Sequence, residues 1–196
     1  SPQEGGSMWY VMQTQAGTES ELCGKCQSQV AREDEEVFVL LAERMTKKQG
    51  KWSMVTGRLF PGYVFVETGR IEDFYKRLKG TGWTARILRT GEEITPVYPE
   101  EEAYLKQLGG REHIVRYSEG YIEGDKLTVT SGAMKGCQGE VKKVLRHKRL
   151  VVMEIPLMGK QVEVTVGMGI VSRAGAARVE RVEESNYLRR KRHKKE

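Results

Sequence analysis

The sequence is poor in the residues that build catalytic, redox and metal centres. Its 196 residues include only 3 histidines and 3 cysteines. No nucleophile–base pair, paired-carboxylate site or phosphate-binding loop emerges from the spacing of the remaining polar residues. We therefore expect no enzyme, no catalytic residue and no cofactor. An odd number of cysteines also argues against a disulfide framework and favours a reducing compartment.

Ligand pairs and long apolar runs are missing as well. The pair Cys23 and Cys26 has no second pair to complete a structural zinc site, and its spacing suits one face of a helix, so no metal is expected. Hydrophobic residues make up 38% of the chain, and no run approaches a membrane span. Residues 1–7 resemble an expression scar before Met8, and no secretory signal follows. These absences predict a cytoplasmic protein without a membrane partner.

What the chain does have is an uneven distribution of positive charge. The formal net charge is +6, but residues 120–196 hold 17 Lys and Arg against 9 Asp and Glu, a balance of +8. The rest of the chain therefore sums to −2. A near-neutral front half and a basic back half point to nucleic acid at the back. The alternative is that these cations only keep a small domain soluble.

Residues 8–110 alternate between strand and helix patterns. Thr18 and Glu21 have the spacing of a capping box at the start of an amphipathic helix. Apolar positions predict a second helix that Gly80 stops, and Pro99 begins a third. The order of elements predicts an α+β domain in which helices cover an antiparallel sheet. Residues 111–120 have weak periodicity and are predicted to be a linker.

Short, closely spaced strand patterns fill residues 121–180. They lie at 126–130, 140–144, 150–155 and 160–166, with a further run at 170–173. Strands this short predict a small, strongly bent sheet that closes into an all-β barrel. Residues 181–196 end in a dense run of cations and are predicted to be a disordered basic tail.

Taken together, these segments resemble the NusG family of transcription elongation factors. The resemblance rests on Trp9-Tyr10-Val11, Phe60-Pro61-Gly62-Tyr63-Val64, Thr95-Pro96-Val97, and Gly124-Asp125 through Arg173. It implies an NGN-like domain at 8–110, which binds RNA polymerase, and an SH3-like KOW domain at 121–180. The basic balance of the second half is similar to that of specialised antitermination paralogues of the LoaP type.

The segment from Phe60 to Tyr63 is the candidate polymerase-binding site. In a regular strand Phe60 and Tyr63 would face opposite sides, but Pro61 and Gly62 can bend the chain and bring both rings to one face. Two exposed rings would form an apolar patch suited to a protein groove. The resemblance implies that this patch binds the clamp helices of RNA polymerase. The alternative is that one or both rings belong to the sheet core.

The segment after the second predicted helix aligns loosely with the loop by which the family touches non-template DNA. A hydroxyl such as that of Thr81 can bond phosphate, Trp83 can stack on a base, and Arg86 adds positive charge. The alternative makes Trp83 a core residue and Thr81 a turn residue.

The candidate RNA-binding residues lie in the predicted barrel. Gly132, Gly136 and Gly139 are expected to shape a structural turn, which also carries Lys135. The denser group consists of Lys142, Lys143, Arg146, His147, Lys148 and Arg149. Such a group can neutralise several phosphates, and arginine can read a base edge or stack on an unpaired base. The alternative is an ordinary solvated turn.

These features predict a non-enzymatic regulator of transcription elongation and antitermination. Its first domain would bind RNA polymerase and suppress pausing, while its KOW domain would bind nascent RNA, expected to be a hairpin. The alternative is an adaptor whose KOW domain binds a termination factor or a ribosomal protein, as the resemblance to general family members implies.

Overall fold

A computed structural model describes residues 6–172 of the chain. In chain order its elements are β1 (Met8–Gln13), α1 (Glu19–Gln29), β2 (Glu36–Phe38), β3 (Leu41–Lys48), β4 (Lys51–Arg58), β5 (Tyr63–Thr68), α2 (Ile71–Gly80), β6 (Arg86–Ile87), β7 (Arg89–Thr90), β8 (Glu93–Ile94), α3 (Pro99–Gly109), β9 (Ile114–Val115), β10 (Ser118–Glu123), β11 (Lys126–Ser131), η1 (Gln138–Glu140), β12 (Val141–Leu145), η2 (Arg146–Lys148), β13 (Leu150–Leu157) and β14 (Lys160–Ile170). None of the helices within the described residues combines the length and hydrophobicity that crossing a bilayer requires.

Two compact units divide the chain, and their residues interleave along the sequence. Within the described residues, unit 1 contains residues 6–42, Thr56–Val115 and Glu154–Val164. Unit 2 contains Glu43–Val55, Arg116–Met153 and residues 165–172. The predicted domain limits at 110 and 120 stay a prediction. The predicted linker 111–120 contains β9 and the beginning of β10.

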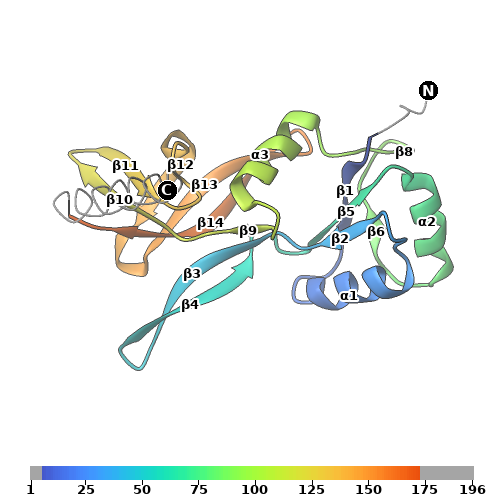
Figure 1. The fold of residues 1–196 in the computed structure, drawn as a ribbon, viewed down its shortest axis with the longest axis horizontal. Helices are drawn as coiled ribbons and strands as arrows, with labels where there is room; N and C mark the ends of the chain where they lie inside the picture. The colour runs from blue at the N-terminus through green and yellow to red at the C-terminus, as the bar shows by residue number, and fades with distance from the viewer. Residues whose placement is uncertain (1–5, 173–196) are drawn as a thin grey trace, which may run out of the picture. The chain divides into compact units, whose positions relative to one another are not determined.

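Unit 1 is built on a four-stranded antiparallel sheet with the strand order β2-β5-β1-β6 (Figure 1). Successive side chains of β1 face opposite sides of this sheet. Tyr10 and Met12 share one buried cluster with Leu22 of α1 and Phe74 of α2, so both helices cover this face. The apolar residues whose spacing predicted these helices therefore form the buried face of each helix.

Aromatic rings fill the opposite face of the sheet in unit 1. Trp9 packs edge-on against Phe38 and Phe65, with ring centroids 4.8 and 5.9 Å apart. The α3 helix lies beside Trp9, because Glu102 accepts a 2.8 Å hydrogen bond from the Trp9 backbone N–H and Nζ of Lys106 lies 5.5 Å from its ring centroid. The prediction of an α+β region with helices over an antiparallel sheet is confirmed.

The predicted capping box at the start of α1 is wrong. The Thr18 hydroxyl donates to the carbonyl of Gln15 at 2.7 Å, and Thr18 makes no side-chain cap with the helix. At the start of α3 a carboxylate does cap the chain. Glu101 is buried and accepts hydrogen bonds from the backbone N–H groups of Tyr98, Met158 and Gly159.

The basic half of the sequence forms a five-stranded sheet with the order β11-β10-β14-β13-β12, in which β10 runs parallel to β14. Its buried residues in unit 2 include Val129, Met134, Val151, Met153 and Met168. The prediction of an all-β region after the α+β region is therefore confirmed. The predicted expression scar lies mostly, and the predicted tail 181–196 entirely, outside the described residues.

Part of the β3–β4 hairpin belongs to unit 2 rather than to unit 1. The Arg44 guanidinium donates to the carbonyl of Thr165 in β14 at 2.7 and 3.0 Å. Glu43 accepts a 2.9 Å hydrogen bond from the Tyr117 backbone N–H just before β10. These contacts fix the hairpin on strands that lie far from it in the sequence.

Candidate functional site

The segment from Phe60 to Tyr63 is a tight turn that leads into β5. The Tyr63 N–H donates to the Phe60 carbonyl at 3.1 Å, and Gly62 has a φ of 83° after Pro61. Proline followed by a residue with positive φ is the pattern of a type II turn. A Cβ on Gly62 would also lie 2.9 Å from the Thr14 carbonyl oxygen, so the turn excludes a larger residue there.

This turn places the rings of Phe60 and Tyr63 side by side, with centroids 6.2 Å apart. Phe60 is only 2% exposed and packs against Phe65, whereas Tyr63 is half-buried and Pro61 is exposed. The expected patch of two exposed rings is therefore wrong for Phe60, because the sheet core takes that ring. Pro61 and Tyr63 remain accessible and line a depression of about 390 Å³ together with Arg86.

The carboxylate of Glu19 holds this turn in shape. It is buried and accepts hydrogen bonds from the N–H of Gly62 at 2.7 Å, the N–H of Gly17 at 3.0 Å and the Arg58 guanidinium at 2.8 Å. Burial raises the pKa of the Glu19 carboxyl, but these hydrogen bonds outweigh burial and leave the pKa below its usual value. The role of Glu19 is not predictable from the sequence, because nothing local distinguishes it from any other acidic residue in the first turn of a helix.

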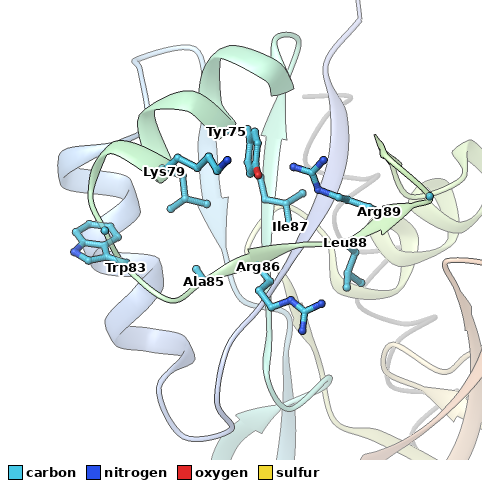
Figure 2. A pocket seen from close by; sticks show the side chains of 11 residues that line it. Tyr75, Lys79, Trp83, Ala85, Arg86, Ile87, Leu88 and Arg89 are labelled. Atoms are coloured by element: carbon cyan, nitrogen blue, oxygen red, sulfur yellow. The ribbon is translucent and has the colours of Figure 1, made fainter.

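A cavity of about 630 Å³ lies between α2 and the chain that follows it (Figure 2). Tyr75 lines this cavity, with Cζ of Arg89 at 4.4 Å and Nζ of Lys79 at 5.2 Å from its ring centroid. Figure 2 shows Lys79 and Arg89 reaching toward Tyr75, while the Arg86 side chain extends the other way. An aromatic ring between two cations suits a nucleotide, which offers both a flat base and a phosphate.

Of the three predicted DNA contacts, Arg86 is exposed, whereas Thr81 and Trp83 are half-buried. The Thr81 hydroxyl donates to the Leu78 carbonyl at 2.6 Å and accepts from the Trp83 N–H at 3.1 Å, so it closes the end of α2. Trp83 is half-buried and packs on the core beneath α1 and α2. The sequence alone does not point to Tyr75 and Lys79 at this cavity, because their helical spacing predicts only a buried helix face and its flank.

The predicted RNA-binding cations gather on β12 and the η2 turn of unit 2. The exposed members of this group are Lys142, Lys143, Arg146, His147 and Lys148. Arg149 is half-buried and has a φ of 54°. Within residues 6–172, no ion pair joins Lys143, Arg146 or Lys148 to a carboxylate. The short connection from β12 to β13 therefore presents these charges to solvent.

The structure does not require glycine equally at the three positions of the predicted turn. Gly132 has a φ of 92°, and a Cβ there would lie 2.3 Å from the Tyr117 carbonyl oxygen. Gly136 has a φ of 86° but open space around it, and Gly139 has neither a positive φ nor a close neighbour. Lys135, in the same turn, is exposed. Only Gly132 is required both by its conformation and by its surroundings.

The two cysteines of α1 serve packing in this structure. Cys23 Sγ donates to the Val37 carbonyl at 3.3 Å, and burial raises the pKa of the Cys26 thiol to about 11. A thiol with that pKa stays protonated near neutral pH, which disfavours both metal binding and nucleophilic attack. The described residues contain no group of three or more His, Cys, Asp or Glu side chains that could hold a metal ion.

Comparison with known proteins bears directly on unit 1 and its turn. The family model described as transcription termination factor nusG matches residues 7–106, which is about half of the chain. The chain belongs to the NusG family. The match covers the Phe60–Tyr63 turn and the cavity around Tyr75, but not the cationic group on β12 and η2.

Relatives of similar length extend the NusG likeness over most of the chain. The transcription termination/antitermination protein NusG of Halalkalibacterium halodurans is 26% identical over 170 residues, which are 80% of this chain and 92% of that protein. The protein of the same name from Staphylococcus carnosus is 26% identical over 176 residues, covering 85% and 95%. A solved structure, entitled domain interaction in Thermotoga maritima NusG, is 21% identical with a TM-score of 0.49 and covers 82% of this chain and 93% of its own.

Proposed function

We propose that this NusG-family chain is a transcription elongation and antitermination regulator that binds RNA polymerase through unit 1 and nascent RNA through unit 2. The observation that carries the proposal is the group of exposed cationic side chains on β12 and η2 of unit 2, Lys142, Lys143, Arg146 and Lys148. A surface of this kind binds phosphates, and its affinity depends on salt. The excess of positive charge in residues 120–196 favours a specialised paralogue over a general adaptor.

The polymerase contact is assigned to the turn that ends at Tyr63. The exposed Pro61 and half-buried Tyr63 present an apolar surface with one hydroxyl, which suits the groove between the clamp helices. Gly62 and Phe60 support this surface from within the fold. A ligand that contacts the closed clamp better than the open clamp shifts the polymerase toward the closed state and thereby reduces pausing.

The RNA contact is assigned to Lys142, Lys143, Arg146, His147, Lys148 and Arg149, with Lys135 on the neighbouring turn. Arginines at a turn can both neutralise phosphates and stack on unpaired bases, which favours a structured RNA with a loop. Because both contacts are made by one chain, binding of the first partner raises the effective concentration of the second. This coupling would keep the regulator on the polymerase during elongation.

A third contact, with the non-template DNA strand, is assigned to the cavity around Tyr75 and to Arg86. Lys79 and Arg89 supply positive charge beside the Tyr75 ring, as a single strand of nucleic acid requires. Thr81 and Trp83, which the sequence suggested for this role, support the loop that borders the cavity.

The decisive experiment measures both main contacts with the full chain. Anisotropy of a fluorescein-labelled RNA stem-loop at several KCl concentrations should show saturable binding, and Arg146→Ala with Lys148→Ala should weaken it and lower its salt dependence. Crosslinking to paused elongation complexes should be lost with Tyr63→Ala while the circular dichroism spectrum stays unchanged. Equal binding to any polyanion would favour the adaptor function, and unchanged crosslinking of Tyr63→Ala would reject the polymerase assignment.

A further inference from the structure

The tip of the β3–β4 hairpin carries three exposed lysines and a half-buried tryptophan, Lys47, Lys48, Lys51 and Trp52. Gln49 and Gly50 join the two strands, with φ values of 50° and 78°. Positive φ at both positions is the pattern of a type I′ turn, which pairs the flanking residues tightly. Lys47, Lys48 and Lys51 therefore stand on the ends of regular strands.

Trp52 connects this hairpin to the cationic turn of the five-stranded sheet. Cζ of Arg149 lies 4.3 Å from the Trp52 ring centroid, and Nζ of Lys47 lies 5.8 Å from the same centroid. The two charges are thus at most about 10 Å apart, comparable to the screening length at physiological salt. Neither forms an ion pair with a carboxylate within residues 6–172, so a bound anion would relieve their repulsion.

The backbone of Arg149 is fixed in an unusual conformation. Its φ of 54° lies in the left-handed region, which glycine and asparagine adopt more readily than arginine. The Arg149 N–H donates to the Arg146 carbonyl at 3.2 Å, and its own carbonyl accepts from the Met168 N–H at 2.9 Å. A strained residue held by its neighbours is a common feature of functional sites. Here it directs the guanidinium onto the Trp52 ring.

The base of the hairpin is equally well fixed within unit 2. Besides the hydrogen bonds from Arg44 to Thr165, a Cβ on Gly167 would lie 2.4 Å from the Glu43 carbonyl oxygen, so the two backbones are in close contact. The hairpin therefore holds its lysines in place beside the cationic turn, and binding a ligand there would need little ordering of the chain.

We propose that the RNA-binding surface extends from the turn at 146–149 onto the β3–β4 hairpin. Trp52 is a positioning residue that holds the Arg149 guanidinium flat, so that its open face stacks on an unpaired base. Lys47, Lys48 and Lys51 neutralise phosphates of the adjoining strand. The ligand is an RNA that has unpaired bases next to a stem. This inference rests on the proposed function and adds residues from the front half of the sequence to its RNA site.

The lysines are tested by salt dependence, with the full chain and a fluorescein-labelled RNA stem-loop. Lys51→Ala should reduce the slope of log affinity against log salt by about 0.7–0.9, the contribution of one phosphate contact. Lys160→Ala is the matched control, because it removes one exposed lysine at the start of β14 in unit 1. Equal slopes for Lys51→Ala, for Lys47→Ala and for the wild type would overturn the phosphate contacts.

Trp52 is tested by comparing the stem-loop with a fully paired RNA duplex of the same length. Trp52→Ala should weaken stem-loop binding about 5- to 150-fold, the range for loss of one stacked base, with a smaller effect on the duplex. The salt slope should stay unchanged, since no charge is removed. Trp52→Tyr should retain most of the affinity, which separates loss of the ring from misfolding. Equal binding by Trp52→Ala and the wild type would overturn the role of Trp52.

The failure of this inference is distinguishable from failure of the proposed function. If the wild-type chain does not bind the stem-loop, or if Arg146→Ala with Lys148→Ala binds it unchanged, the proposed RNA function fails. If those variants bind weakly while every hairpin variant binds like the wild type, the RNA site is confined to the five-stranded sheet and the hairpin assignment is wrong.

Discussion

The buried carboxylate of Glu19 accepts a 2.7 Å hydrogen bond from the backbone N–H of Gly62. A residue in the first turn of α1 thereby fixes the turn that presents Tyr63 for the proposed polymerase contact. The same carboxylate binds the Gly17 N–H and the Arg58 guanidinium. A buried acidic side chain that does not itself reach the surface therefore helps to hold the Phe60–Tyr63 turn, together with the backbone hydrogen bonds from Tyr63 to Phe60 and from Thr14 to Gly62.

Glu19→Gln should destabilise the chain by roughly 1–3 kcal/mol. The glutamine side chain has one acceptor oxygen instead of two, so a backbone N–H that donates to Glu19 would face the amide nitrogen and lose its hydrogen bond. Urea unfolding at pH 7 measures this loss. Glu21→Gln, on the same helix, removes an exposed carboxylate paired with Lys25 and should change stability by less than about 1 kcal/mol. Equal effects of the two substitutions would contradict the assigned role of Glu19.

The stability that Glu19 provides should also depend on pH. Its folded-state pKa lies below the ordinary value of a glutamate carboxyl, which is the value expected in the unfolded chain. The contribution is therefore fully present above that unfolded value and is lost as the pH falls through the lower folded value. Between pH 5 and pH 3 the wild type should lose more stability than Glu19→Gln, as urea midpoints across this range would show. Parallel pH profiles would refute the prediction.

Phe60→Ala and Tyr63→Ala should separate stability from binding. Phe60 is buried, so its truncation should cost about 3–5 kcal/mol by leaving a cavity against Phe65. Tyr63 is half-buried, and its truncation should cost less stability while removing the polymerase contact. Thermal unfolding and crosslinking to elongation complexes measure the two effects. A larger loss of stability for Tyr63→Ala than for Phe60→Ala would reverse the assignment of core and surface rings.

Gly132→Ala should destabilise the fold and Gly139→Ala should not, although both glycines lie in one predicted turn. At Gly132 the new Cβ would clash with the Tyr117 carbonyl in a left-handed conformation, so the loss should exceed about 1 kcal/mol. At Gly139 the backbone is ordinary and the space is open, so the change should stay within about 0.5 kcal/mol. Denaturant midpoints of the full chain compare the two variants directly.

Local rules explain why much of the fold was predictable from the sequence. Pro99 at the first position of α3 and Gly80 at the end of α2 mark helix limits without reference to the rest of the chain. Alternation of apolar and polar residues likewise located β11 and the first part of β14. These signals lie within a few residues of the feature that they predict.

The candidate sites depended instead on contacts between distant segments. Pro61 and Gly62 correctly indicated a turn, but only the packing against Phe65 decides that Phe60 is buried. Trp52 and Arg149 are far apart in the sequence, and no local pattern predicts that their side chains stack. Pairings of this kind arise from tertiary structure, so the residue types can be read from the sequence but their partners cannot.

The cavity around Tyr75 provides a test of the proposed contact with non-template DNA. Loss of one base-stacking ring costs about 1–3 kcal/mol in single-strand binding, so Tyr75→Ala should weaken binding of a fluorescein-labelled single-stranded DNA about 5- to 150-fold. Arg89→Ala should weaken it less and lower its salt dependence, because it removes one charge beside the ring.

Lys76→Ala is the matched control for the Tyr75 cavity, since Lys76 is exposed on α2 and does not line the cavity. Thr81→Val should differ from Tyr75→Ala and from Lys76→Ala, because it removes the Thr81 hydroxyl that is hydrogen-bonded to the backbone of Leu78 and Trp83. It should lower the midpoint of thermal unfolding and reduce DNA binding only through disorder of the loop. If Thr81→Val abolishes DNA binding without loss of stability while Tyr75→Ala binds normally, the DNA contact lies on the loop and not in the cavity.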